Sequence, residues 1–376
     1  MNIALVTMRT DPSRGGAERY TVDLAGALQR AGHDVSMLAS SFGGVPGGVA
    51  EVPLAARGFT RVGRYRAFLD SLDRHLAANR YDVVHAMLPV RQCHVYHPHA
   101  GMMRANVASD SLWTRLSNPR RRYVARVEGE LLEGPAAPVV LCLSEYVKSA
   151  VKQVYDLPDD RLPILFNAVD LDRFDPAMNR AAREETRKRF GFGPRDVVGL
   201  FLGHDYERKG LREAIQGLLR AATGSGDERL KLLVVGRPRG AAYRALARQS
   251  KIGPRVVFAG HMPDSRPAYQ AADFLVLPTR HDPCSLVVLE GLAMGVPVIS
   301  TRFNGACEIM TSGTHGFVLD HPGDLKGLAD AMLAMTDDGR RGEMAAASLS
   351  LRPALAYQRH LDTLLAIYGR IRRPSA

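Results

Sequence analysis

Residues 272–301, ADFLVLPTRHDPCSLVVLEGLAMGVPVIST, decide the fold of this chain. Their apolar spacing predicts a strand at 274–277, a helix that Ser285 caps, and a second strand at 296–299. Two strands joined through one helix form a βαβ unit, whose strands run parallel and whose crossover is right-handed. Ligands of open parallel sheets bind beyond the carboxyl ends of the strands, next to helix N-termini that favour anions. The loop 279–284 lies at such an end, so we expect the ligand there.

Two carboxylates belong to this loop and helix. Asp282 lies in the loop, and Glu290 follows one to two turns into the predicted helix. Because carboxylates repel phosphates, we expect the pair to accept hydrogen bonds from sugar hydroxyls beside the anion-binding helix N-terminus. That combination describes a nucleotide-sugar pocket. The alternative, that Glu290 only belongs to the polar face of an amphipathic helix, stays open at this point.

Length and composition indicate a two-domain globular protein. The 376 residues exceed what one core usually serves, and the apolar fraction of 46% is ordinary. No apolar run reaches about 18 residues, and Met1 opens directly into a strand, so we expect neither a membrane span nor a leader. The four cysteines form no C-x-x-C pair, which favours a reduced, cytoplasmic setting without structural zinc. The net charge of +11 favours anionic partners, namely phosphorylated substrate, acidic lipid headgroups or nucleic acid.

The start of the chain predicts a second βαβ unit, with strands at 2–8 and 34–39 around a helix at 17–31. The pair Gly15–Gly16 precedes this helix, but no G-x-G-x-x-G occurs, so a dinucleotide fingerprint is not supported. The paired glycines permit close approach of a substrate to the backbone, or they form a plain tight turn.

Arginine-rich helices and further strands are predicted in the rest of the first half. The helices lie at 61–80 and 115–132, and the strands at 81–87, 139–143 and 162–166. The basic faces of the two helices are either solvated or lie against acidic lipid.

Three histidines follow the predicted strand 81–87 within six residues. They are His94, His97 and His99, and Pro98 separates the last two. Neither H-E-x-x-H nor a nearby acidic cluster completes a metal site. A histidine at the mouth of a parallel sheet is a candidate acid, base or polar contact. Loop histidines without chemistry are the alternative.

The second half repeats the alternation of strands and helices after a polar connection at 170–179. Strands are predicted at 196–202, 230–235 and 255–259, and a glycine follows each of them, at Gly203, Gly236 and Gly260. Such glycines leave room for a ligand against the backbone. Arg208 and Lys209 stand between the first of these tips and a helix, where they could neutralise a diphosphate or remain a solvated pair.

The last quarter of the chain predicts two helices, at 322–335 and 352–372. The second is long and amphipathic with a basic end, and the segment 337–350 between them is expected to be exposed and mobile.

Several of these motifs together resemble the retaining GT-B glycosyltransferases of family 4. The segment from Asp282 to Glu290, followed by GVPVI, resembles the E-x7-E signature of that family, with Asp282 in place of the first Glu. The motifs GGAER, FNAVD, RKG and AAD occur in the family's order, at 15–19, 166–170, 208–210 and 271–273. Ala168 replaces a frequent Gly. The pattern D-x-x-R-K-G at 205–210 is similar to that of the glucosyltransferases of the lipopolysaccharide core.

The resemblance implies an α/β fold of two Rossmann-like domains that face each other across a cleft. Residues 1–168 would bind the acceptor and residues 169–350 the nucleotide sugar. Residues 351–376 would form a helix that crosses back to the N-terminal domain.

The resemblance also implies roles for individual residues. Glu290 would accept the ribose hydroxyls, Arg208 and Lys209 would bind the diphosphate, and the backbone near His261 would read the base. The implied donor-binding set comprises Gly16, Arg208, Lys209, His261, Cys284, Ser285, Leu286 and Glu290. The implied catalytic residues are His99, near the reacting carbon, and Asp282, at the donor sugar. The implied acceptor contacts are Arg19 and His97.

The expected activity is retaining, metal-independent transfer of a hexose, with glucose from UDP-glucose as the first choice. The expected acceptor is a lipopolysaccharide core or another envelope glycan or lipid. We expect a cytoplasmic monomer that associates peripherally with acidic membrane on its inner face, and no nucleic-acid partner, metal or cofactor.

Two other classes compete with this interpretation. A nucleotide-sugar epimerase or NAD-dependent oxidoreductase could use two Rossmann domains, but G-x-G-x-x-G and Tyr-x-x-x-Lys are both missing. A nucleic-acid-binding protein is suggested by charge alone, and no helix-turn-helix, RRM-type or zinc pattern supports it.

Overall fold

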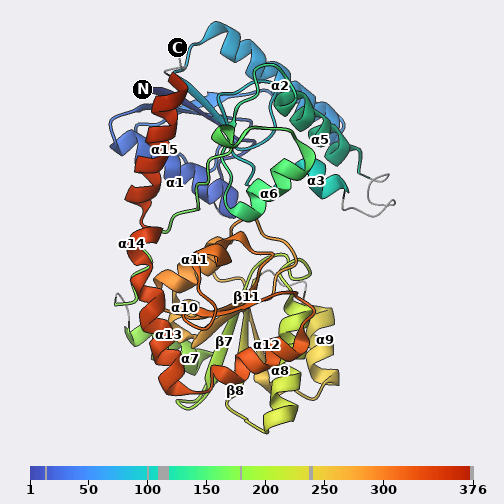
Figure 1. The fold of residues 1–376 in the computed structure, drawn as a ribbon, viewed down its shortest axis with the longest axis vertical. Helices are drawn as coiled ribbons and strands as arrows, with labels where there is room; N and C mark the ends of the chain where they lie inside the picture. The colour runs from blue at the N-terminus through green and yellow to red at the C-terminus, as the bar shows by residue number, and fades with distance from the viewer. Residues whose placement is uncertain (13–14, 100, 109–117, 178–179, 237–239, 373–376) are drawn as a thin grey trace. The chain divides into compact units, whose positions relative to one another are not determined.

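The computed structural model describes residues 1–12, 15–99, 101–108, 118–177, 180–236 and 240–372. The chain divides into two compact units, residues 1–166 with 360–376, and residues 167–359. Each unit builds a six-stranded parallel sheet with helices packed on it (Figure 1). The boundaries expected from the sequence lie at 168 and 350, near the first of these junctions and before the second.

The first unit places β1 (Asn2–Val6) inside its sheet. The strand order is β3-β2-β1-β4-β5-β6, and Ile3 pairs with Val35 on one side and Val83 on the other. β1 is apolar and buried from Ile3 onward, because helices cover both faces of a parallel sheet. The other strands are β2 (Asp34–Ala39), β3 (Ala50–Pro53), β4 (Val83–Ala86), β5 (Val95–Tyr96) and β6 (Val139–Val140).

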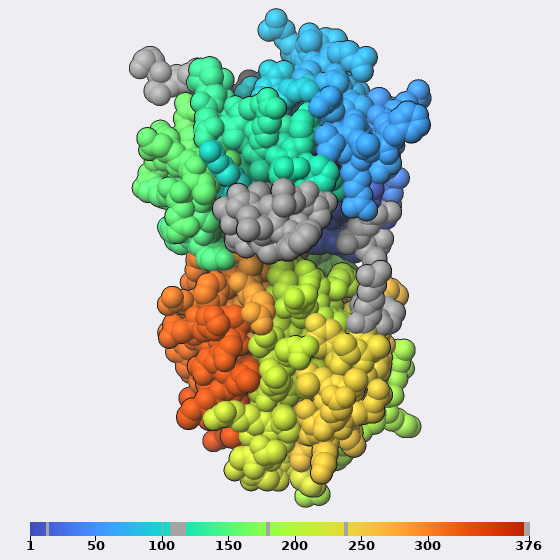
Figure 2. Space-filling model, turned by 90° about the vertical axis from the view of Figure 1, so that its right-hand side faces the viewer, coloured from blue at the N-terminus to red at the C-terminus, as the bar shows by residue number. Residues whose placement is uncertain are grey.

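The helices of this unit flank the sheet, and α2 packs against α5 on its surface (Figures 1 and 2). They are α1 (Gly16–Arg30), α2 (Arg61–Ala78), α3 (Met103–Ala108), α5 (Pro119–Leu132), α6 (Glu145–Val154), the short turn η1 (Asp159–Arg161) and most of α15 (Tyr357–Arg372). The Ser144 hydroxyl accepts a hydrogen bond from the Val147 N–H at 3.2 Å, so this predicted helix cap is confirmed.

The second unit repeats this topology with β7 (Val197–Leu202) in the place of β1. Its order is β12-β11-β10-β7-β8-β9, built from β8 (Leu230–Val235), β9 (Val256–Gly260), β10 (Phe274–Leu277), β11 (Val298–Thr301) and β12 (Gly316–Leu319). The predicted βαβ unit of residues 272–301 is confirmed, because β10 and β11 pair in parallel through α11 (Leu286–Ala293).

The remaining helices of the second unit cover its sheet. They are α7 (Arg180–Arg189), α8 (Leu211–Ser225), α9 (Ala241–Gln249), α10 (Arg266–Ala271), α12 (Leu325–Ala334), α13 (Asp338–Ser350), α14 (Arg352–Leu355) and the short turns η2 (Gly253–Arg255) and η3 (Gly305–Ile309). None of the helices in the described part of the chain is long and apolar enough to cross a membrane.

Strand order reverses at one place in each sheet. In the first unit the chain leaves β1 to build β2 and β3 on one side and later continues with β4 on the other, and β7 and β10 mark the same reversal in the second unit. Loops at the carboxyl ends of two such strands diverge and leave a crevice where ligands bind. The loops after β7 and β10 are therefore the first place to look in the second unit.

The segment 337–350, expected to be exposed and mobile, forms the helix α13, and all of its residues except Met344 and Ser348 are exposed or partly exposed. The Asp337 carboxylate caps the helix by accepting a hydrogen bond from the Arg340 N–H at 3.0 Å. Met344 and Ser348 lie four residues apart and are both buried. One apolar side chain among alanines and serines was too weak a signal to indicate a buried face.

The predicted single helix at 352–372 is broken at Ala356, whose backbone is extended. α14 ends before it and α15 begins after it. The Leu355 carbonyl accepts a hydrogen bond from the Val169 N–H at 2.9 Å, and Val169 and Ala356 form a β-bridge. This pairing with a distant strand-like segment outweighs the local preference for helix.

Two predicted strands of the first unit are shorter than expected. The strand predicted at 139–143 is limited to β6, and the segment 162–166 contributes only a bridge between Ile164 and Cys142. The start of the helix predicted at 115–132 lies outside the described residues, and α5 begins at Pro119.

Candidate functional site

The loops after β7 and β10 are held against each other in the second unit. The Arg208 carbonyl accepts hydrogen bonds from the Thr279 hydroxyl and from the Arg280 N–H, both at 2.9 Å. Gly210 occupies the N-cap position before α8 with φ 81°, and a Cβ there would lie 2.1 Å from the Pro278 carbonyl oxygen. Only glycine permits this approach, which fixes the loop that carries the two predicted cations.

Lys209 and Arg208 both reach Asp282 from this loop. The Lys209 ammonium forms an ion pair with the Asp282 carboxylate and lies 3.4 Å from the Ser285 hydroxyl. The Arg208 guanidinium donates to the His281 carbonyl at 2.8 Å and lies 4.0 Å from the same carboxylate. Lys209 and Asp282 are nearly buried, whereas the Arg208 side chain is 40% exposed. Asp205 also pairs with Arg208 at 3.2 Å, so the two cations of this crevice face two carboxylates, of which Asp282 is the nearly buried one.

The N-terminus of α11 adjoins these charges. Ser285 occupies the N-cap position, as predicted, although its side chain accepts no hydrogen bond from a helix N–H. The Asn304 side-chain oxygen instead accepts a hydrogen bond from the Ser285 N–H at 3.2 Å, and the Asn167 amide donates to the Cys284 carbonyl at 2.9 Å. The N–H of Leu286, the first residue of the helix, has no acceptor within it and favours an anion.

Glu290 lies farther along α11 and is partly exposed. The Tyr269 hydroxyl donates to its carboxylate at 2.7 Å. Burial and the neighbouring Glu290 charge raise the pKa of Tyr269 well above its usual range, so the hydroxyl stays protonated and remains a donor. This contact orients the carboxylate.

His261 follows Gly260 at the tip of β9, is exposed, and has its ring 5.9 Å from that of His204.

The histidines of the first unit form a buried cluster beyond β4 and β5. The ring centres of His97 and His99 are 4.1 Å apart, and those of His85 and His97 are 5.4 Å apart. Neither ring nitrogen of His97 has a hydrogen-bond partner among the described residues. Burial lowers the pKa of His85 and of His99 to about 3 and that of His97 well below its usual range. These rings are therefore neutral at pH 7.

Two tyrosines and α15 enclose the histidine cluster. The Tyr20 ring lies 4.4 Å from the His99 ring, and its hydroxyl is 2.8 Å from His360 Nε2. His360 Nδ1 lies 2.7 Å from the Phe166 carbonyl, which fixes Nδ1 as the protonated nitrogen and leaves Nε2 to accept from Tyr20. The Tyr368 hydroxyl bonds His85 Nδ1 at 2.6 Å.

The remaining predicted residues of the first unit lie on α1, which carries Tyr20. Gly16 is its first residue and is exposed, and the Arg19 N–H donates to the Gly15 carbonyl at 3.1 Å. Part of the loop before Gly15 lies outside the described residues.

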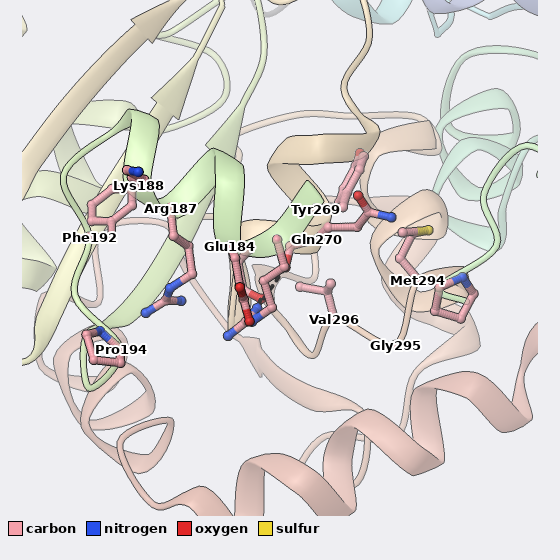
Figure 3. Close-up of a pocket in the computed structure, with 13 residues that line it drawn as sticks. Glu184, Arg187, Lys188, Phe192, Pro194, Tyr269, Gln270, Met294, Gly295 and Val296 are labelled. Carbon is pink, nitrogen blue, oxygen red and sulfur yellow. Dashed lines mark hydrogen bonds between the residues drawn. The ribbon is translucent and has the colours of Figure 1, made fainter. Parts of the chain in front are cut away.

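A separate cavity of about 780 Å³ lies at the opposite, amino-terminal edge of the second sheet (Figure 3). Glu184, Arg187 and Lys188 of α7 and residues 294–296 line it. The Arg187 guanidinium pairs with Asp273 at 3.1 Å and also bonds backbone carbonyls, so this arginine holds the fold together. The cavity is distinct from the crevice after β7 and β10.

In the described part of the chain, no group of three or more His, Cys, Asp or Glu is arranged to hold a metal ion.

Two family models cover most of the chain. Glycosyltransferase Family 4 matches residues 14–173, and Glycosyl transferases group 1 matches residues 196–338. The chain belongs to glycosyltransferase family 4. For this glycosyltransferase, the topology of both sheets and the predicted GT-B fold agree with solved structures of the GT-B class.

Individual relatives of this glycosyltransferase extend over nearly its whole length. It is 25% identical to the D-inositol 3-phosphate glycosyltransferase of Corynebacterium diphtheriae, over 98% of this chain and 94% of the relative. It is 24% identical to the lipopolysaccharide glucosyltransferase WaaG of Escherichia coli, over 82% of each chain. A crystal structure of WaaG matches with a TM-score of 0.85, covering 98% of this chain and 100% of that chain at 22% identity. The Anabaena protein HepE in complex with UDP-glucose matches with a TM-score of 0.73, covering 97% and 99% at 17% identity.

The structure brings several predicted residues of this glycosyltransferase together and adds others. Arg208, Lys209, Asp282 and Ser285 meet at one crevice, next to Cys284 and Leu286. Asn304 and Tyr269, which fix Ser285 and Glu290, were missed. The sequence signal for Asn304 was an Asn–Gly pair shortly after the strand predicted at 296–299, where such a residue often ends a strand.

Proposed function

We propose that this glycosyltransferase transfers a hexose, glucose from UDP-glucose, with retention and without a metal ion, to a glycan or glycolipid of the cell envelope. The observation that carries the proposal is the crevice after β7 and β10. There Arg208 and Lys209 adjoin the N-terminus of α11, at the strand-order reversal of the second sheet.

The chemistry of this crevice suits departure of a nucleoside diphosphate. Negative charge grows on the diphosphate as the glycosidic bond breaks, and fixed cations together with helix N–H groups stabilise it. Arg208 is the more exposed cation and is our choice for direct phosphate contact, while Lys209 holds the Asp282 carboxylate in place through their ion pair. Glu290, oriented by Tyr269, would accept the ribose hydroxyls.

The histidines of the first unit suit a neutral role in this proposal. Because the pKa of His99 lies near 3, its imidazole would donate or accept a hydrogen bond at the sugar and would carry no charge at pH 7. His97 would support it from behind, with Arg19 and Gly16 contributing from α1.

The choice of donor and acceptor draws on the named relatives. WaaG is named as a lipopolysaccharide glucosyltransferase, and HepE has been solved with UDP-glucose.

The first turn of α5 carries Arg120, Arg121 and Arg122 and no acidic residue. We assign the outer face of α5 to peripheral contact with acidic lipid on the cytoplasmic side of the membrane, by a monomeric enzyme. Sedimentation with anionic and zwitterionic vesicles tests this assignment.

A thermal-shift and calorimetric panel of nucleotides and nucleotide sugars, with EDTA present, tests the proposal. A ligand that binds only the folded state raises the melting temperature, so UDP and UDP-glucose should raise it without metal. GDP- and ADP-sugars are the matched controls for the base, and UDP-galactose is the control for the sugar. Stabilisation by UDP only after a divalent metal is restored would contradict the metal-independent mechanism. No stabilisation by any nucleotide would contradict the donor site itself.

A further inference from the structure

An arginine-lined hollow opens at the carboxyl edge of the first unit's sheet. Its volume is about 930 Å³, and its walls come from the segments after β1 and β2, from β3 and the loop that follows it, and from the starts of α2 and α5. Five arginines line it: Arg9, Arg57, Arg61, Arg64 and Arg120. Among the described residues, no acidic side chain lines it and none of the five arginines forms an ion pair with a carboxylate.

The placement of these arginines opposes helix stability. Arg61 and Arg64 lie in the first turn of α2 and Arg120 in that of α5, and neither turn contains an acidic residue. A helix N-terminus is itself partly positive, so each arginine there costs roughly 0.3–1 kcal/mol instead of stabilising the helix. Asp70 of α2 is already paired with Arg91 at 2.8 Å. The hollow therefore holds positive charge that the fold does not balance and that an anion would neutralise.

Tyr65, Ser40 and Ser41 contribute hydroxyl groups to this lining, and two of the three already donate within the protein. The Tyr65 hydroxyl donates to the Pro89 carbonyl, and the Ser40 hydroxyl donates to the Met8 carbonyl at 2.7 Å. Their protons are thus already used within the protein. Guanidinium groups bind phosphate oxygens in bidentate pairs, so the lining selects for a phosphate rather than for sugar hydroxyls.

We propose that this hollow binds a phosphate group carried by the acceptor glycan. The inference rests on the proposed function, because it assigns the ligand to the acceptor. His97 and His99 follow β5, which lies three strands from β2 in the same sheet. The segment after β1 also lines the hollow, and β1 lies two strands from β5, so at about 4.8 Å between neighbouring strands the two places are roughly 10–15 Å apart. The phosphate and the hydroxyl that reacts therefore belong to different sugar residues of the acceptor.

Calorimetry with glucose 6-phosphate, and with glucose as the neutral control, tests this proposal. Saturating UDP and EDTA are present so that the diphosphate site of the second unit is filled. The wild-type chain should bind glucose 6-phosphate and not glucose. Arg61→Ala/Arg64→Ala should weaken this binding about tenfold or more. The matched control is Arg74→Ala, which removes a charge from α2 outside the hollow and should change nothing.

The double variant also has a stability readout. Because it removes charges that oppose the helix dipole, it should melt at the wild-type temperature or above and keep the wild-type affinity for UDP. Equal binding of glucose 6-phosphate by all three proteins, or by none, would overturn the anion site. Sedimentation with phosphatidylglycerol vesicles that depends on Arg61 and Arg64, without binding of glucose 6-phosphate, would overturn the glycan assignment and make the hollow a membrane contact.

One result would contradict the proposed donor site without affecting the proposal for the hollow. Glucose 6-phosphate is also titrated without UDP. Failure of the wild-type chain to bind UDP, with binding to the hollow intact, would therefore count against the donor site and not against the hollow.

Discussion

Glu290 offers a residue-scale test of how the nucleotide is read. Its carboxylate is oriented by the Tyr269 hydroxyl at 2.7 Å, and we expect it to accept the ribose hydroxyls. Hydrogen bonds to a charged group contribute about 1.5–3 kcal/mol, so Glu290→Gln should lower the affinity for UDP by about tenfold to a hundredfold. Calorimetry with inorganic pyrophosphate should show no change, because pyrophosphate has no ribose.

A variant of Arg208 is the control for the Glu290 test, because we expect Arg208 to contact the phosphates and Glu290 the ribose. Arg208→Ala should weaken UDP and pyrophosphate alike, since both present phosphates to the exposed guanidinium. If Glu290→Gln also weakened both ligands equally, Glu290 would not be at the ribose.

Variants of the ion pair between Lys209 and Asp282 allow its effect on folding stability and its effect on UDP binding to be measured separately. Both side chains are nearly buried, at 11% and 9% exposed, so Lys209→Met leaves a buried carboxylate without its nearest cation, with Arg208 4.0 Å away. Such a loss costs about 3–5 kcal/mol in the free energy of unfolding. Lys209→Met/Asp282→Asn should recover most of that stability but not the affinity for UDP. Urea unfolding and UDP calorimetry on both variants measure the two effects, and a double variant as unstable as the single one would contradict the pairing.

The sequence correctly predicted those side chains of the site whose location follows from their position directly after a strand. Arg208, Asp282 and Ser285 follow the tips of neighbouring parallel strands, and such tips meet at one edge of a sheet. Asn304 and Tyr269 could not be found this way. Asn304 reaches the Ser285 N–H across 19 residues, and Tyr269 reaches Glu290 from a preceding helix. Both contacts depend on how β11 and α10 pack, which apolar periodicity does not encode.

At the element scale, the two ends of α8 form a natural pair of test sites. Gly210 precedes the helix with φ 81° and Gly226 follows it with φ 68°, so alanine is strained at both. The added Cβ meets nothing within 4 Å at Gly226 but would lie 2.1 Å from the Pro278 oxygen at Gly210. Gly226→Ala should therefore cost about 1–2 kcal/mol.

Gly210→Ala should cost clearly more than Gly226→Ala in urea unfolding and should also weaken UDP binding, because it displaces the loop that carries Arg208 and Lys209. Similar costs at both ends would show that the loop yields easily to the added Cβ.

The sequence predicted helices and strands well where a run or a periodic pattern of apolar residues marks a buried element. β10, α11 and β11 are such a case. The two-residue strand β5 escaped prediction because a strand so short leaves no alternation to detect. β12 is as long as β10 and β11 but is only partly buried in its middle, and it was missed as well. α13 escaped because its buried face contains one large apolar residue, Met344.

At the scale of the whole molecule, acid should destabilise the first unit through its histidines. His85, His97, His99 and His360 come from β4, the segment after β5, and α15, and burial lowers the pKa of each. In the unfolded chain a histidine titrates near pH 6.5. Below that pH the unfolded chain binds more protons than the folded one, so the free energy of unfolding falls as the pH falls. At pH 5 each histidine held neutral lowers it by up to about 2 kcal/mol.

His97→Phe is the variant that measures this contribution, because it removes one buried imidazole whose two nitrogens have no partner among the described residues. Urea unfolding at pH 7.5 and at pH 5 should show a wild-type loss that exceeds the loss in the variant by about 2 kcal/mol. Burial raises the pKa of Glu128 in the same unit, which acts in the opposite direction in both proteins and cancels in the comparison. An equal loss in the two proteins would mean that His97 is protonated in the folded state at pH 5. The neutral imidazoles that the proposed mechanism uses would then be charged in mild acid.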